Sequence, residues 1–323
     1  MDPIDQVLEG LRLQGSVFSR MELGAGWGFS KECLGGAPFH LVIEGEAWVG
    51  HDADDLVRLG VGEMAIFPRG EAHLLLSAHD AEALPFHRIA VDIGLPEWRP
   101  GIRLKPRVLR FGTNGPPVTR LVSGIFEFAD RRRNPLLSAL PDILMLRGIS
   151  GERARTTIRT VAMTIDHEVE ASAPGARLVA ARLADYLFVE AVREHLVSNG
   201  RDDRGWLRGL GDPLVGRALS LIHADPGRDW SVDLLAIEVG ASRSQFAQRF
   251  RALVERGPIE YLREWRMFLA SAHLAEAQMP LKEIARRAGY RSVPAFGRAF
   301  KLWAGEPPAA VRRTRQAVAA VQR

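Results

Sequence analysis

A stretch of the chain that has helical periodicity gathers polar side chains on one face. From Arg243 onward, at about 100° per residue, one side of the helix collects five residues: Arg243, Ser244, Ala247, Gln248 and Arg251. Arginine and glutamine carry hydrogen-bonding groups that match the edges of base pairs in the DNA major groove. The chemistry that this face could perform is therefore recognition of DNA.

A second helical stretch carries different side chains at the corresponding positions. Its outer face presents Val293, Pro294, Gly297, Arg298 and Lys301. Pro294 is compatible with the first turn of a helix, because the amide groups there have no intrahelical partner. Arg298 is the residue of this face best suited to hydrogen-bond bases, while thymine methyl contacts and DNA shape would supply the remainder.

Each polar face follows elements that could hold it in place. A short helix that contains Ala236 leads into Gly240, where a glycine tolerates the positive φ that a sharp turn requires. Ser242 then caps the next helix, with Gln245 three residues later in a capping-box pattern. The same order returns in the second stretch, where the equivalent residues are Ala285, Gly289 and Ser292.

Pairs of phenylalanines complete the repeat and predict which side of each helix is buried. Phe246 and Phe250 recur as Phe296 and Phe300. A longer helix that begins at Pro258 could fix the separation of the two units. Two helix-turn-helix units about one turn of DNA apart (~34 Å) would enter successive major grooves. The alternative is an all-helical interaction domain whose arginines are simply solvated.

The charge distribution favours the DNA interpretation. The net charge of +4 is uneven: residues 1–200 carry 22 Lys and Arg against 26 Asp and Glu, and residues 201–323 carry 21 against 13. A basic C-terminal third joined to a mildly acidic body suggests a module that binds a polyanion.

The periodicity predicts an α+β protein of more than one domain. Residues 1 to about 130 contain short apolar runs separated by Gly, Pro and Asp, which is typical of an antiparallel β-barrel or sandwich. Residues 175–197 read as an amphipathic helix that could pack on the β domain or pair with a second subunit. We expect a β domain with flanking helices over 1–198, a linker over 199–213 and a helical DNA-binding domain over 214–313.

The C-terminal third resembles the AraC/XylS family of bacterial transcription regulators. The resemblance covers about 100 residues and rests on a specific set of positions, namely Gly240–Ser244, Phe246, Phe250, Arg266, Ala270, Leu274, Gly289, Tyr290, Ser292, Phe296, Arg298, Phe300, Lys301 and Pro307–Arg313.

This resemblance implies roles for the two polar faces. Four residues of each helix would face bases: Arg243, Ser244, Ala247 and Gln248 in the first, and Val293, Pro294, Gly297 and Arg298 in the second. Arg251 and Lys301 would contact phosphates, which set affinity rather than sequence choice. The implied partners are double-stranded DNA, RNA polymerase, a small-molecule effector and a second copy of the chain.

The N-terminal half resembles a cupin-type ligand domain. Residues 62–73 look like the second cupin motif, and His40 followed by Glu44 is similar to the end of the first. Pro38 stands where that motif has another histidine. The residues that remain, His40, Glu44 and His73, could ligate a divalent ion, since imidazole suits Zn, Fe, Cu or Ni.

Three interpretations of these histidines stay open. They could hydrogen-bond within the β domain, anchor a small-molecule effector, or form a metal-dependent sensor. The complete cupin ligand set is missing, which disfavours a cupin metalloenzyme with a helical appendage. We therefore expect a regulator rather than an enzyme.

Composition limits the remaining classes. The sequence has no apolar run of the ~18 residues that a transmembrane helix needs. Its first residues lack the layout of a signal peptide. A single cysteine, Cys33, cannot form an internal disulfide. These features predict a cytoplasmic protein.

Overall fold

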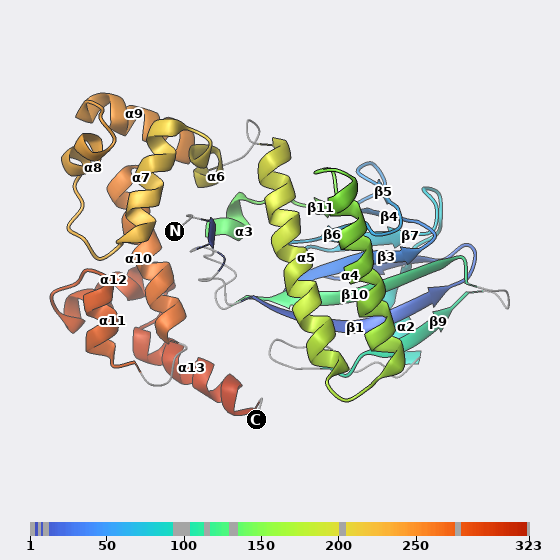
Figure 1. Cartoon of the computed structure of the whole chain (residues 1–323). Helices are drawn as coiled ribbons and strands as arrows, with labels where there is room; N and C mark the ends of the chain where they lie inside the picture. Colours follow the sequence, from blue (N-terminus) through green and yellow to red (C-terminus); the bar gives the residue numbers. More distant parts are fainter. Residues whose placement is uncertain are drawn as a thin grey trace. The chain divides into compact units, whose positions relative to one another are not determined.

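The chain divides into two compact units. The computed structural model describes residues 4–5, 8, 13–92, 104–112, 117–128, 135–199, 205–274 and 279–321. The sandwich unit comprises Leu13–Glu127 and Pro141–Ser198, and the helical unit comprises Met1–Arg12, Phe128–Leu140 and Asn199–Arg323 (Figure 1).

Two sheets form the sandwich unit. The larger has the strand order β11-β6-β3-β10-β1-β9, and the smaller has β5-β4-β7-β2-β8. The strands of the larger sheet are β1 (Gln14–Leu23), β3 (Ala37–Glu44), β6 (Met64–Ile66), β9 (Arg107–Phe111), β10 (Thr119–Glu127) and β11 (Leu144–Leu146). Those of the smaller sheet are β2 (Gly28–Lys31), β4 (Ala47–Gly50), β5 (Val57–Leu59), β7 (His73–Leu76) and β8 (Leu84–Pro85).

The expected antiparallel barrel is wrong in two respects. β9 pairs with β1 in parallel, and β8 pairs with β2 in parallel, so both sheets are mixed. Within the described residues the sheets are also open, with β11, β9, β5 and β8 at their edges. The parallel pairs join strands that are far apart in sequence, whereas the hairpin pattern of the sequence indicates only antiparallel neighbours.

The core of the sandwich unit lies between the two sheets. Its members are large apolar side chains from both, including Trp27, Phe29, Phe67, Leu75 and Leu121. The helix α2 (Phe86–Asp92) contacts β2 of the smaller sheet.

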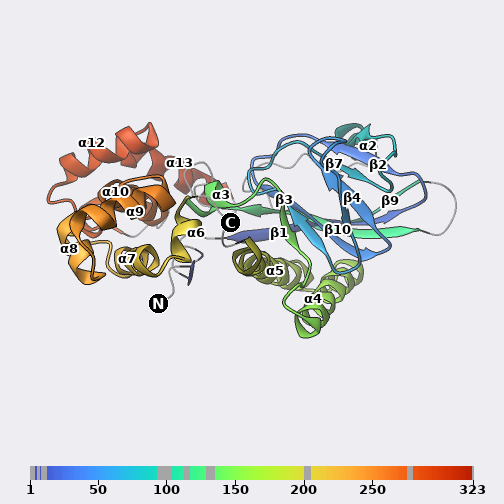
Figure 2. The ribbon, with the colours of Figure 1, turned by 90° about the horizontal axis from the view of Figure 1, so that it is seen from above.

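The helices α4 (Glu152–Ala171) and α5 (Ala176–Asn199) lie side by side against the other face of the larger sheet, as Figures 1 and 2 show. Arg20 on β1 donates to the carboxylate of Asp166 on α4 at 2.7 Å, and both side chains are buried. Phe126 and Phe188 bring β10 and α5 into ring contact. The helix predicted over 175–197 is therefore confirmed, and it packs on the β-sheet.

The helical unit contains a series of short helices in its described residues. They are α3 (Pro135–Ala139), α6 (Gly205–Leu210), α7 (Pro213–Ala224), α8 (Val232–Glu238), α9 (Arg243–Val254), α10 (Pro258–Leu274), α11 (Leu281–Arg287), α12 (Val293–Ala304) and α13 (Pro308–Val321). The predicted linker 199–213 thus includes the helix α6.

One of these helices comes from the middle of the chain. α3 lies in sequence between β10 and β11 of the sandwich unit, but it belongs to the helical unit and contacts α6 there. Leu136 and Leu137 of α3 are fully buried. α6 in turn contacts α7 and α9.

The duplicated pattern of the sequence becomes two similar structures, α8 with α9 and α11 with α12. Phe296 and Phe300 are buried in a cluster with Met267, Leu274 and Ile284, and Phe246 and Phe250 are buried in the first copy. Within the described residues, no helix has both the length and the apolarity to span a membrane.

Candidate nucleic-acid interface

Each repeated unit is a helix-turn-helix module whose turn requires a glycine. Gly240 has φ of 72° and Gly289 has φ of 76°, the left-handed region that only glycine adopts without a steric cost. α8 and α11 have 7 residues each, and α9 and α12 have 12 each. We call α8–α9 the first module and α11–α12 the second module.

Serine caps fix the start of each second helix, as the sequence predicts. The Ser242 hydroxyl accepts from the Gln245 amide at 3.3 Å, and the Ser292 hydroxyl accepts from the Ala295 amide at 3.3 Å. A capped amino end satisfies amide groups that would otherwise have no partner. The side chains of the first turn are thereby held in the same relation to each module.

The structure brings the predicted base-facing residues of α9 together on the surface. Arg243, Ser244 and Gln248 are exposed and Ala247 is partly buried, while Arg251 is exposed one turn further along. The Arg243 side chain lies 3.5 Å from the Asp233 carboxylate of α8.

The predicted face of α12 is also at the surface but has less polar chemistry. Pro294, Arg298 and Lys301 are exposed, and Val293 and Gly297 are partly buried. A Cβ at Gly297 would meet open space. Without a side chain at this position, another molecule could approach the helix backbone closely.

Sequence reasoning missed Asp212, which joins the first module to the rest of the helical unit. One oxygen of its carboxylate caps α7 by accepting from the Leu214 and Val215 amides at 3.0 and 2.9 Å. The other oxygen accepts both Nε and Nη2 of Arg249 on α9, at 2.8 and 2.5 Å. The signal in the sequence was Asp212 followed by proline, a typical helix start.

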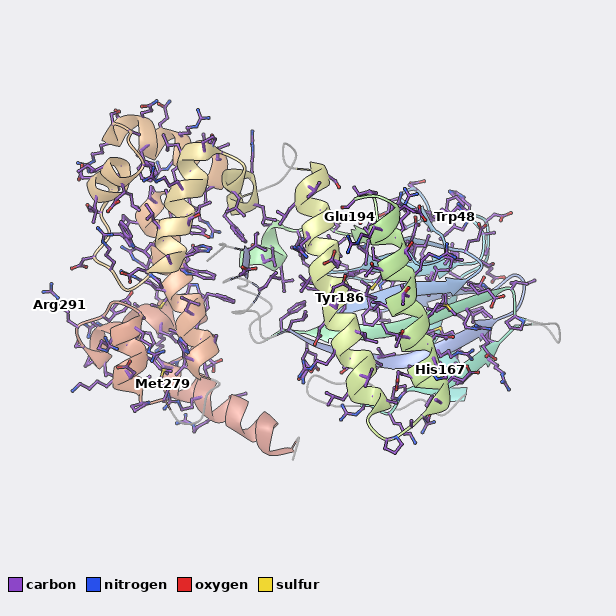
Figure 3. The ribbon with its side chains drawn as sticks, viewed as in Figure 1. Trp48, His167, Tyr186, Glu194, Met279 and Arg291 are labelled. Carbon is purple, nitrogen blue, oxygen red and sulfur yellow. The ribbon has the colours of Figure 1, made fainter. Side chains whose placement is uncertain are left out.

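Arg291 is a second surface residue outside the predicted set. It precedes the capping residue Ser292 and is exposed, and Figure 3 shows its side chain extending away from the helical unit.

In the sandwich unit, His40 and His73 meet between the sheets. Their Nε2 atoms lie 2.9 Å apart. His73 Nδ1 must donate to the Glu71 carbonyl, at 2.9 Å, so its Nε2 accepts from His40. His40 Nδ1 then accepts from the Ser123 hydroxyl at 2.8 Å. This chain of hydrogen bonds uses every ring nitrogen of the pair.

Both histidines of the pair are neutral at physiological pH. Burial lowers the pKa of His40 well below its ordinary value, and burial lowers the pKa of His73 to about 3. The rings also pack on Phe67, which is stacked on His73 with 3.9 Å between ring centres.

Glu44, the third residue of the predicted set, does not join the pair. The pairing of β3 with β10 shifts register between Leu121 and Arg120, which is a β-bulge. A bulge reverses the alternation of side chains, so Val42 faces the inner core and Glu44 faces the other side. There it lies 3.1 Å from Arg120.

The residues present do not fit a divalent metal. A zinc ion needs three or four ligands at about 2.0–2.3 Å, and the described residues contain no group of three or more His, Cys, Asp and Glu that could hold one. The two Nε2 atoms are occupied by the hydrogen bond between them.

Lys31 is a further polar group beside the pair. It faces His73 directly across strands β2 and β7, and its ammonium lies 3.8 Å from the centre of the Phe86 ring. Burial lowers the pKa of Lys31 to about 7. Among the described residues it has no carboxylate partner.

The fold and the duplicated modules define a class of protein, a DNA-binding regulator with two helix-turn-helix modules and a second, β-rich unit. Family comparison agrees: residues 2–197 match the Cupin family and residues 235–314 match the Helix-turn-helix domain family.

The chain belongs to the AraC family of transcription regulators. It is 32% identical to a putative AraC-like transcription regulator of Streptomyces lividans, over 97% of this chain and 98% of that protein. It is 26% identical to the HTH-type transcriptional regulator AlkR of Acinetobacter baylyi, over 93% of this chain and 95% of that protein.

A solved structure is also similar to part of this chain. The DNA-binding domain of the global transcriptional factor AdpA, in complex with a target DNA, is 30% identical to the part of this chain that it matches. That match covers 33% of this chain and 95% of that chain, with a TM-score of 0.31. The two sequence relatives are named as transcription regulators, which is the class that the sequence predicts.

Proposed function

We propose that the two modules bind one duplex together, with α9 and α12 in successive major grooves. Arg243, Ser244 and Gln248 would read bases in one groove, and Arg298 would read them in the next, with Ala247, Val293, Pro294 and Gly297 close to the bases. Arg251 and Lys301 would contact phosphates.

The observation that carries this proposal is the equivalence of the two modules. The glycine turn, the serine cap of the second helix and the helix lengths are the same in both, so α9 and α12 present their first two turns in the same way. A helix of this size fits the major groove, and a pair of them on one unit suits two adjacent grooves of a duplex.

Binding-site selection tests the proposal. The full chain is used to select duplexes from random DNA, and binding is measured on single-base variants of the selected duplex. Two conserved blocks about one helical turn apart are expected, and Arg298→Ala should remove the preference within only one block. A single block, or an equal loss at every position, would contradict binding by both modules.

We further propose that the sandwich unit binds a small-molecule effector between its sheets, beside His40, His73 and Lys31. A half-buried amine without a counter-charge is costly, and an acceptor group on a ligand would offset that cost. Partial exposure of Lys31 leaves a route from solvent. Glu44 faces the other side of the sheet and is not part of this proposed site.

The effector proposal can be tested on the full chain with a panel of small organic acids. A binder is expected to raise the melting temperature, and Lys31→Met should abolish that rise. Lys282→Met, in α11 of the helical unit, is the matched control and should retain it. A rise that survives Lys31→Met would remove Lys31 from the site.

The connection from β10 to β11 offers a covalent route by which such an effector could influence DNA binding. Ser123 on β10 bonds His40, and the chain that leaves β10 continues into α3 of the helical unit, which packs on α6. Pairing of two copies and contact with RNA polymerase stay predictions.

A further inference from the structure

A cleft of about 590 Å³ lies between the two helix-turn-helix modules. Its walls are the loop 225–228 that leads into α8, the helix α10, and the carboxyl end of α11. Its charged lining is mostly cationic, with four arginines against one carboxylate, and it also contains His273. The arginines are Arg228, Arg266, Arg286 and Arg287, and the carboxylate is that of Asp225. We call it the inter-module cleft.

Arg266 of α10 connects two walls of the cleft. Its Nε donates to the Pro226 carbonyl at 2.5 Å, and its Nη2 donates to the Arg228 carbonyl at 2.8 Å. A Cβ at Gly289 would lie 2.7 Å from its guanidinium carbon. Arg266 therefore ties the loop before the first module to α10 and lies close to the turn of the second module, with two of its five N–H donors engaged by the loop.

Three exposed arginines at the edge of the cleft, Arg228, Arg286 and Arg287, form what we call its rim, and they have more N–H donors than their carboxylate partners can accept. Arg286 and Arg287 share a single carboxylate, that of Glu283, at 2.7 to 2.9 Å. These two guanidinium groups lower the pKa of Glu283 to about 2. Each guanidinium carries five N–H donors, and Arg286 and Arg287 stay well exposed, at 73% and 50%.

Arg228 is the rim residue on the opposite wall. It donates to Glu238 at 2.9 Å and lies over the Trp230 ring at 4.1 Å. The three rim arginines thus outnumber the two carboxylates that they contact, those of Glu238 and Glu283.

We infer that the inter-module cleft binds the sugar-phosphate backbone of the DNA that runs between the two recognition helices. The inference rests on the proposed binding mode. When α9 and α12 occupy successive major grooves, the protein surface between them faces the intervening minor groove and the backbones that border it. Guanidinium groups match phosphate oxygens through paired hydrogen bonds.

A backbone contact of this kind has a distinct thermodynamic signature. Each phosphate neutralised releases a counterion, so affinity depends on salt with a slope that grows by about 0.9 per contact, whatever the base sequence. Rim arginines would therefore set affinity, and the recognition helices would set sequence choice.

The test uses the full chain and a duplex that it has selected from random DNA, over a series of salt concentrations. Arg286→Ala and Arg287→Ala are each expected to weaken binding about fivefold and to reduce the salt slope by about 1, equally for all base variants. Arg256→Ala is the matched control, since Arg256 is exposed and paired with Glu264 outside the cleft, and it should change neither quantity.

The charge-conserving variants Arg286→Lys and Arg287→Lys should keep the salt slope. An unchanged slope in both alanine variants, or an effect that depends on base sequence, would overturn the inference. Such a result would leave the proposed binding mode intact as long as Arg298→Ala still alters one block of the site.

Neutral backbone substitutions identify the source of the phosphate. Methylphosphonate linkages placed midway between the two blocks should weaken binding of the unmodified chain, and should have a clearly smaller effect on a double variant that carries both Arg286→Ala and Arg287→Ala. If the linkages have no effect, while inorganic phosphate raises the melting temperature of the unmodified chain but not of Arg287→Ala, the cleft binds free anions and the inference fails.

Discussion

In the first helix-turn-helix module, α9 presents Arg243, Ser244 and Gln248 to solvent, whereas α12 of the second module presents Pro294 and Arg298. Their caps, turns and lengths are the same. The frame of such a module follows from local rules of helix capping and chain reversal, while the ability to read bases depends on a few surface side chains that can change independently of the frame.

The two modules also differ in what supports them. Asp212 and α6 support α9, whereas α12 packs in a cluster with α10, α11 and α13. Gly240 faces open space, but Gly289 faces the guanidinium of Arg266. The same turn is therefore exposed in one module and enclosed in the other.

The largest effect that separates the modules should come from their turn glycines. Gly240→Ala places a side chain at positive φ, which costs about 1–2 kcal/mol. Gly289→Ala carries the same cost and also displaces Arg266 from two carbonyls, which adds about 1–3 kcal/mol. Hydrogen exchange of the amides in 232–254 and 281–304 measures each module separately. Equal losses of exchange protection in the two variants would show that the contact between Gly289 and Arg266 does not contribute to the stability of the second module.

Next in size is the difference in base reading. Arg298→Ala should cost about 1–3 kcal/mol at one base pair and leave the second module without a polar base reader from the predicted set. Gln248→Ala should cost as much at its own base pair, but Arg243 and Ser244 would preserve preference elsewhere in the first block. Affinities for all single-base variants of a selected duplex check both. If the Arg298→Ala variant keeps its base preference in the second block, sequence recognition there depends on Val293, Pro294 and DNA shape instead.

Asp212 gives a smaller effect that is confined to the first module. Asp212→Ala removes the cap of α7 and should lower stability by about 1–2 kcal/mol, and it also releases Arg249 from its carboxylate partner. Exchange protection should fall in α7 and α9 and stay unchanged in α12. A uniform loss across both modules would indicate that they unfold as one cooperative structure and would remove the distinction in support.

Much of the DNA-binding half could be predicted because its determinants are local. Gly240, Gly289, Ser242 and Ser292 act within a few residues of themselves, so one sequence is sufficient to place the turns and caps. Phe246 and Phe296 are buried as the helical period requires.

The failures come from contacts between distant parts of the chain. The bulge that turns Glu44 away from His40 is set by the pairing of β3 with β10, about 80 residues later in the sequence, and the alternation rule assumes no bulge. The parallel edge strands β8 and β9 and the packing of α3 on α6 likewise depend on non-local packing. Arg249 could not be assigned to Asp212 because nothing local links them.

The smallest expected effect concerns Arg251 and Lys301, which occupy equivalent exposed positions beyond the base-facing turns. Each is predicted to contact a phosphate, so Arg251→Ala and Lys301→Ala should each reduce the salt slope by about 1 and weaken all base variants alike. Because the charge is the same in both modules, the two losses should be equal, in contrast to the unequal losses of the base readers. Titrations at several salt concentrations compare them directly. A larger loss of affinity for Arg251→Ala would show that the two modules differ in their phosphate contacts as well as in their base contacts. It would imply that α9 lies closer to the duplex than α12.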